Sequence, residues 1–271
     1  MGVEILKHLE LKVTPPNQFN DPFEFTPHII SSNPIRKARA ILKSKTHLKD
    51  WYVAEIRAGN FRGTFREYRK FVKLNRKVMV VDMARHFPTA TAEVQQEMLD
   101  KISMTYGVLC LSKRRDSILM WGHYCDKHRG LVIGFDASNA VFNAKNGNVL
   151  RPVVYVKERV VFDATWNEND DLKFSQYEQQ IILSKNADWS YEEELRLSGV
   201  LSPLKRKPLS DGSAGYFLPI PPAAFKTVTL GARFPSGLEN EVRATLAQTN
   251  LSHVKIDRAE LHESKFELRF V

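Results

Sequence analysis

The sequence has few cysteines and no long apolar run. Its two cysteines, Cys110 and Cys125, both lie in apolar patterns without zinc-ligand spacing, so we expect two buried thiols and neither a disulfide nor a metal site. No stretch approaches the roughly 20 apolar residues of a membrane helix, and the N-terminus lacks a signal-peptide core. These absences favour a cytoplasmic protein with no membrane partner.

Common catalytic signatures are also missing. The chain contains no glycine-rich phosphate-binding loop, no nucleophile elbow and no HExxH motif. Hydrophobic residues make up 43% and charged residues 26% of the 271 positions, which is typical of a globular protein with one large core, or one core plus a helical insert.

Positive charge is concentrated in one region. Between Arg36 and Lys77 there are 14 Lys and Arg against 3 acidic residues, a local charge of +11, so the remaining chain carries about −2 of the net +9. Such crowding favours an anionic partner, and nucleic acid fits. The alternative is a solvated helix face.

The basic region has clear helix signals. Asn33-Pro34 is a strong start for a helix reaching about Ala58, and Thr64 with Glu67 forms a capping box for a second helix reaching about His86. Aromatic residues between the basic ones could stack on bases, but at helical spacing they more often face the core.

The most informative segment runs from Tyr106 to Asp136. Two apolar runs, 108–112 and 131–135, predict strands on either side of a short helix that carries Trp121 on its apolar face. His123, Tyr124 and His128 are packed closely into this small unit, which suggests that they line a site.

The second informative segment is KNADWSYEEELR, at 185–196. If it is extended, side-chain alternation places Glu192, Glu194 and Arg196 on one side of the strand. Such a row of charges is costly to bury unpaired, so it meets water or belongs to a site. A local or cross-strand ion pair is the structural alternative.

A third motif, FNDPFE, occupies 19–24. Asn20 and Asp21 precede a proline and are turn formers. The motif is either a rigid corner pinned by its two phenylalanines or a segment that brings Asn20, Asp21 or Glu24 to the rim of the site.

Together these motifs resemble domain-of-unknown-function family 2971. The resemblance rests on FNDPFE, the MWGHYCDKHRGLVIGFD block, WSYEEELR and the closing FELRF, which extend in order over nearly the whole chain. The family opens with a strand carrying a Tyr-Lys-Tyr-like motif, for which Met1 to Leu9 is too short. We therefore expect any site residue of that strand to be missing or differently supplied.

The arrangement is also similar, at the level of fold, to ADP-ribosyltransferases. That resemblance implies NAD as cofactor or substrate, with Glu194 or Glu192 stabilising an oxocarbenium-like ribosyl cation. His123 is a further catalytic candidate. Tyr124 would hold ribose or stack on nicotinamide, Trp121 would form a wall, and Arg196 would bind phosphate. An NAD glycohydrolase is a related possibility.

The other function class is a non-catalytic nucleic-acid-binding protein. It would use the basic helices at 36–77, with Arg62, Arg66, Arg69 and Lys73 contacting phosphates. The two functions are compatible, because a nucleotide transferase could hold a nucleic-acid or protein target with this region. Such a combination would suit a toxin or phage-defence effector.

For the fold we predict the α+β class, with a twisted, mostly antiparallel sheet. Short strands follow turn signals along the chain, whereas the predicted helices cluster in the N-terminal half. We expect a single domain over 1–271 with a basic helical insert at about 33–106.

Overall fold

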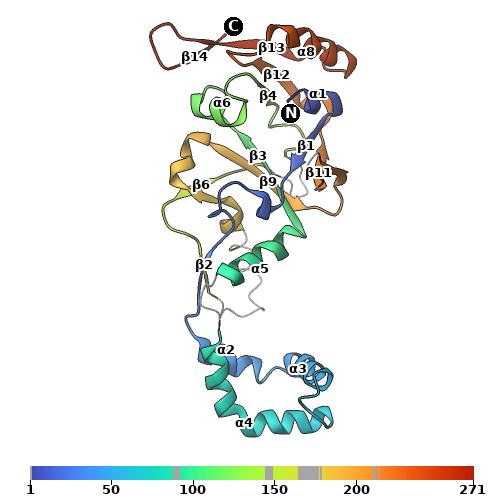
Figure 1. Cartoon of the computed structure of the whole chain (residues 1–271), viewed down its shortest axis with the longest axis vertical. Coiled ribbons are helices and arrows are strands. Elements are labelled where there is room, and N and C mark those ends of the chain that lie inside the picture. The colour runs from blue at the N-terminus through green and yellow to red at the C-terminus, as the bar shows by residue number, and fades with distance from the viewer. Residues whose placement is uncertain are drawn as a thin grey trace. The chain divides into compact units, whose positions relative to one another are not determined.

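The computed structural model describes residues 2–87, 92–143, 149–163, 177, 179–209, 212 and 214–271. The chain forms two compact units (Figure 1). Unit 1 comprises Met1–Phe25, Leu99–Glu158 and Ile182–Val271, and unit 2 comprises Thr26–Met98 and Arg159–Ile181. Within the described ranges, no helix has both the length and the apolar character needed to cross a bilayer.

The α+β class is confirmed, and the strands are divided among several small sheets. The helices of unit 1 are α1 (Gly2–His8), η1 (Pro16–Gln18), α6 (Ile118–Tyr124), η2 (Ala187–Glu192), η3 (Pro222–Ala224) and α8 (Ser236–Gln248). Its strands are β1 (Glu10–Val13), β3 (Tyr106–Ser112), β4 (Leu131–Phe135), β5 (Arg151–Pro152), β6 (Val154–Val156), β8 (Ser184–Asn186), β9 (Glu194–Val200), β10 (Lys205–Pro208), β11 (Ala214–Pro219), β12 (Phe225–Leu230), β13 (Lys255–Leu261) and β14 (Leu268–Phe270).

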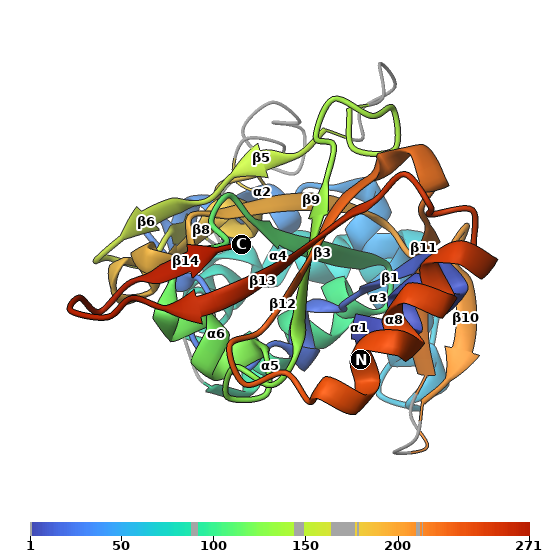
Figure 2. The same ribbon diagram turned by 90° about the horizontal axis from the view of Figure 1, so that it is seen from above.

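Sheet pairing in unit 1 is mostly antiparallel. The strand orders are β1-β11-β10, β3-β9-β5 and β14-β13-β12-β4, with a separate β6-β8 pair. Only β12-β13 and β6-β8 are parallel among the described pairs of this unit. Figure 2 shows β14, β13 and β12 running next to one another. The two strands predicted around α6 exist, but β3 pairs with β9 whereas β4 pairs with β12.

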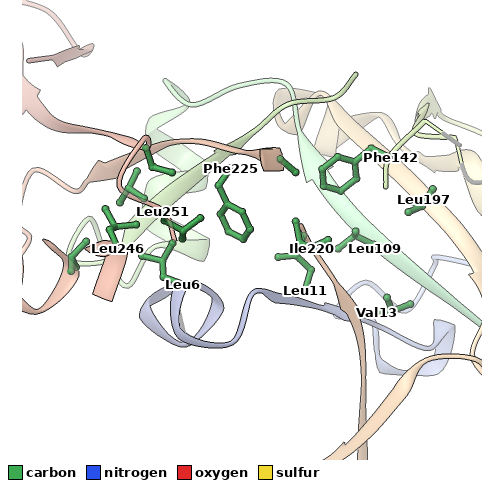
Figure 3. Packing of buried hydrophobic residues seen from close by; sticks show 14 of the residues in the cluster. Leu6, Leu11, Val13, Leu109, Phe142, Leu197, Ile220, Phe225, Leu246 and Leu251 are labelled. Carbon is green, nitrogen blue, oxygen red and sulfur yellow. The ribbon is translucent and has the colours of Figure 1, made fainter. Parts of the chain in front are cut away.

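The main core lies between these sheets and the helices α1 and α8. It includes Leu6 from α1, Phe225 from β12 and Leu246 from α8, all buried (Figure 3). Fully burying a side chain of this size contributes roughly 1.5–3 kcal/mol, so these contacts hold the sheets in place.

Unit 2 contains the basic helices. Its elements are β2 (His28–Ile30), α2 (Pro34–Ile41), α3 (Lys45–Arg57), α4 (Phe65–Arg85), most of α5 (Ala92–Ser103) and β7 (Val161–Asp163). The helix predicted from Asn33 to Ala58 is in fact two helices, because the Ser44 hydroxyl caps the backbone N–H of His47 and starts a new helix. The capping box of Thr64 and Glu67 is confirmed.

A small core holds α2, α3 and α4 together. Its buried members are Ala38, Leu42, Leu48, Tyr68, Val72 and Val80. Parallel pairing of β2 with β7 joins the two chain segments of this unit.

Candidate functional site

Five ionisable side chains meet inside unit 1. They are Glu24, Lys185, Glu192, Glu194 and Arg196, and each side chain is at most 5% exposed. We call this set the charge cluster. It combines three carboxyl groups with two cations, so full ionisation would leave one excess negative charge in a buried place.

The local backbone of 185–196 differs from the extended strand that we predicted. Residues 187–192 form the 3-10 helix η2, because the Asn186 side chain accepts from the backbone N–H of Asp188. Glu193 then adopts a left-handed conformation with φ of 43°, and β9 begins only at Glu194. Glu192 therefore reaches the cluster from a helix end, and Glu194 and Arg196 reach it by strand alternation.

Lys185 bridges the carboxylates. Its ammonium donates to Glu192 Oε2 at 2.6 Å and to Glu194 Oε2 at 3.0 Å, and lies 3.5 Å from Glu24 Oε1. Burial would lower the pKa of Lys185, but the neighbouring carboxylates outweigh burial and raise it. Lys185 is therefore a cation held in place by three acidic groups.

Arg196 has protein partners on every nitrogen. Its Nε donates to Glu194 Oε1 at 2.7 Å, Nη1 donates to the Ile182 carbonyl at 2.7 Å, and Nη2 donates to Glu194 and to Glu24. The side chain is fully buried. All nitrogens of its guanidinium thus donate to buried protein groups, and no N–H group is exposed to bind a substrate phosphate as we predicted.

The FNDPFE motif supplies one wall of the cluster. The Asp21 carboxylate accepts from the backbone N–H of Phe23, which stabilises the turn that carries Glu24 inward. The rings of Phe19 and Phe25 lie 5.6 and 5.2 Å from the Arg196 guanidinium. The motif therefore contributes Glu24 to the cluster and two aromatic rings that lie against Arg196.

Of the three residues of this motif that were predicted at the rim of the site, Asn20 and Asp21 do not join the charge cluster. Asn20 is exposed, whereas Asp21 is buried and acts within the turn. The motif thus contributes to the site through Glu24, which lies three residues after Asp21.

The protein shifts the pKa values of Glu24 and Glu194 in opposite directions. Burial raises the pKa of Glu24, although Arg196 and Lys185 act against burial. For Glu194 burial also acts upward, but hydrogen bonding and charge from Arg196, with help from Lys185, hold its pKa below the usual range. Glu24 Oε1 has no hydrogen-bond partner among the described residues. Glu24 is therefore the group on which a proton would relieve the excess negative charge.

Two accessible residues border the cluster. Tyr124, 53% exposed, donates its hydroxyl hydrogen to Glu192 Oε1 at 2.7 Å. Both cysteines were predicted to be buried, but Cys110 is exposed and Cys125 is half-buried. Cys110 hydrogen-bonds Glu194 and lies opposite Arg196 in the β3-β9 pair. Desolvation by the surrounding protein and the Glu194 charge raise the pKa of this thiol, although by surface area the residue is exposed.

His123 and Trp121 precede Tyr124 on α6 and differ from each other in exposure. His123 is exposed and its ring lies 6.3 Å from the Tyr124 ring. Trp121 is 1% exposed and packs against Ala259 and Leu268. Its indole N–H donates to the Arg115 carbonyl at 2.6 Å, so Trp121 anchors α6 to the sheet.

A left-handed turn follows α6. Asp126, Lys127 and His128 have φ values of 46°, 55° and 69°, a conformation that side chains with a Cβ disfavour by roughly 1–2 kcal/mol each. The backbone N–H of His128 donates to the Trp121 carbonyl, and the His128 ring stacks on the indole at 6.1 Å. These contacts stabilise the strained turn.

A cavity lies on another side of α6. It has a volume of about 500 Å³ and is lined by Ile118, His128 and the β13-β14 hairpin from Leu261 to Leu268. None of the charge cluster residues lines this cavity. His128 therefore borders this cavity, whereas Tyr124 does not line it.

The basic residues predicted to contact nucleic acid lie in unit 2. Arg62 precedes α4, and Arg66, Arg69 and Lys73 lie on it, all exposed. The nearby aromatic residues pack mainly on one another: the rings of Tyr52, Phe61 and Tyr68 lie 5.1–6.4 Å apart. Phe61 and Tyr68 therefore help to form the unit 2 core.

Sequence reasoning missed Lys185 as a site residue. The only signal was its position at the start of the 185–196 segment, and nothing in the sequence showed that a lysine in the short strand β8 would be buried beside three carboxyl groups. In the part of the chain that the structure describes, no group of three His, Cys, Asp or Glu residues could hold a metal ion.

Comparison with known proteins supports part of the family resemblance. No curated protein and no solved structure matches the chain. A family model described as "Protein of unknown function (DUF2971)" matches residues 120–197, so FNDPFE and FELRF lie outside the matched region. The segment that carries α6, the left-handed turn, Lys185, Glu192, Glu194 and Arg196 is thus similar to family DUF2971.

Proposed function

We propose that the charge cluster and Tyr124 form the active site of an enzyme that uses NAD or a related nucleotide, as an ADP-ribosyltransferase-like or NAD-glycohydrolase-like enzyme. The observation that carries the proposal is the 2.7 Å hydrogen bond to Glu192 from the hydroxyl of Tyr124, a residue that is 53% exposed. This bond connects a half-exposed side chain to the charge cluster, which has three carboxyl groups and two cations.

Glu192 is the better catalytic candidate of the two glutamates. Glu194 accepts from Lys185, from two nitrogens of Arg196 and from Cys110, so its oxygens are fully used. Glu192 shares one oxygen with Lys185 and the other with Tyr124. We assign Glu194 to positioning Lys185 and Arg196, and Glu192 to the reacting side.

The chemistry needs a fixed negative charge. When the bond between ribose C1′ and nicotinamide breaks, both bonding electrons leave with nicotinamide and C1′ becomes cationic. A carboxylate near C1′ stabilises that charge, and a water or target nucleophile then bonds to C1′ and releases a proton. In this proposal Tyr124 and His123, both exposed, contact the ribose or the nicotinamide.

Nicotinamide release from NAD tests the proposal. We expect Glu192→Gln to lower the rate by about 100-fold or more, the usual effect of removing one such electrostatic group. Glu193→Gln is the matched control, because Glu193 is the neighbouring residue but points to solvent. Equal rates for wild type and Glu192→Gln would reject the assignment, and so would an absence of both turnover and thermal stabilisation by NAD or ADP-ribose.

A second candidate function is nucleic-acid binding by unit 2. It is favoured by Arg62, Arg66, Arg69 and Lys73, which are exposed and make no ion pair within the described residues. If all four contact phosphates of a duplex, the affinity should fall with a log–log salt slope of about −3.6, and neutralising all four should remove that slope. Binding that does not depend on salt would contradict this function.

The two functions together would suit a toxin or defence effector that modifies nucleic acid or protein. Expression in a host would then arrest growth, and Glu192→Gln would relieve the arrest. Growth arrest that persists in Glu192→Gln would contradict an enzymatic cause.

A further inference from the structure

Helix α4 has two apolar faces. Tyr68, Val72 and Val80 form the buried face that packs on α2 and α3. A second stripe consists of Phe71, Leu74, Val78 and Val81, whose exposed fractions are 47%, 75%, 73% and 48%. A soluble helix normally needs only one apolar face, so the second stripe calls for a partner.

The spacing of this second stripe is that of a coiled-coil seam. Its members are separated by three, four and three residues, as alternate a and d positions of a heptad repeat. A stripe made only of a and d positions covers a narrow strip along the helix. The usual partner of such a strip is another helix.

The charges at the two ends of the seam indicate which helix is the partner and in which direction it runs. Continuing the same spacing places Glu67 at the N-terminal end and Arg85 at the C-terminal end, both exposed. In a parallel pair of α4 helices each of these charges would face its own copy. In an antiparallel pair, Glu67 faces Arg85 of the second copy.

The apolar residues fit the same arrangement. About a two-fold axis near position 76, Phe71 packs against Val81 of the second copy, and Leu74 packs against Val78. These are the mixed a–d layers of an antiparallel pair, and the same surface serves both partners, as a two-fold symmetric interface requires.

We propose that a second copy of this chain docks on the exposed stripe of α4, antiparallel, to form a two-fold symmetric dimer through unit 2. The seam spans only four apolar residues, and Lys77 lies beside the axis, where it faces its own copy. Association is therefore weak, at the low end of specific interfaces.

Sedimentation of the full chain over about 1–100 μM, a range in which small interfaces dissociate, tests for the dimer. We expect a monomer–dimer equilibrium in the wild type and at least about tenfold weaker association in Leu74→Asp and Val78→Asp, since each places a charge in the seam. Ile35→Asp is the matched control, because Ile35 is 47% exposed on α2 of the same unit. Circular dichroism checks that each variant is folded.

Charge and cross-linking variants test the orientation. Lys77→Gln should tighten association, because it removes the repulsion at the axis. A mixture of Leu74→Cys and Val78→Cys chains should form a disulfide between positions 74 and 78, identified by peptide mapping, while neither variant should cross-link with itself at that position.

Several results would overturn the proposal. The wild type could stay monomeric at the highest concentration, or Leu74→Asp could leave the dimer unchanged. A disulfide between two Leu74→Cys chains would indicate a parallel pair. Pelleting of a monomeric protein with anionic vesicles, lost in Leu74→Asp, would show that the stripe meets lipid instead.

Discussion

Tyr124 and Glu192 are joined by a 2.7 Å hydrogen bond although 68 residues separate them in the chain. The bond connects the end of α6 to the end of η2. At this bond the charge cluster contacts a half-exposed side chain. Removing the bond therefore measures the contribution of Tyr124 while leaving the buried ion pairs in place.

Tyr124→Phe should lower the free energy of unfolding by about 1 kcal/mol. The substitution removes a donor from a charged acceptor, but Tyr124 is half exposed, so water can replace the lost hydroxyl. Urea denaturation measures the change. Tyr191→Phe is the control, because within the described residues the Tyr191 hydroxyl makes no hydrogen bond to the cluster. An equal loss in both variants would contradict a specific role for the Tyr124 bond.

Glu194→Gln should be far more destabilising than Glu24→Gln. Removing the Glu194 charge leaves Arg196 and Lys185 in the interior without their main partner, a change that typically costs about 3–5 kcal/mol. Glu24 is the group that favours its neutral form, so a glutamine amide replaces it at less cost. Chemical denaturation of the two variants at neutral pH gives the comparison, and equal losses would contradict it.

The stability of the protein should carry a pH-dependent contribution from Glu24. Burial raises its pKa, so in the window above the ordinary value of 4.5 the folded chain holds a proton that the unfolded chain has released. Stability linked to this proton is present at low pH and is lost as the pH rises through the folded-state pKa.

Glu194 behaves in the opposite way. Its pKa is lowered, so its contribution is present above the ordinary value and is lost as the pH falls through the folded-state pKa. Because Glu24→Gln removes only the titration of Glu24, the stability of the wild type relative to this variant, measured from about pH 4 to pH 7, should fall as the pH rises. A difference between them that does not change with pH would contradict the assignment of the proton to Glu24.

Gly231→Ala should destabilise unit 1 strongly. The added methyl group would overlap the His128 carbonyl oxygen and approach that of Gly130, both backbone atoms of the left-handed turn region. Backbone cannot yield as a flexible side chain can, so we expect a loss of about 3 kcal/mol or more. Gly237→Ala in α8 is the control, since nothing lies within 4 Å of the new methyl group, and it should be neutral or stabilising.

Local signals in the sequence predicted much of the secondary structure. Apolar runs predicted β3 and β4, and the capping box predicted the start of α4. They failed where side chains compete with the expected backbone. Ser44 starts a second helix within the predicted long one.

The candidate site was only partly predictable. Strand alternation placed Glu194 and Arg196 together, and that pairing holds although η2 replaces most of the predicted strand. The inward turn of Glu24 depends on its contacts with Arg196 and Lys185, which lie more than 160 residues away in the chain, and the Glu24 contact also encloses Lys185. No periodicity or spacing within one segment encodes such contacts, which is why these two members of the cluster became visible only in the fold.

The pairing of β2 with β7 sets an order of events during synthesis. Helices α2, α3 and α4 pack mainly on one another and can form soon after they leave the ribosome, whereas β2 must wait until residues 161–163 have been made. Until then, more than 130 residues separate the strand from its partner. A chain truncated between these strands would therefore keep its basic helices but leave β2 without a neighbour on that edge, exposed to pairing with other nascent chains.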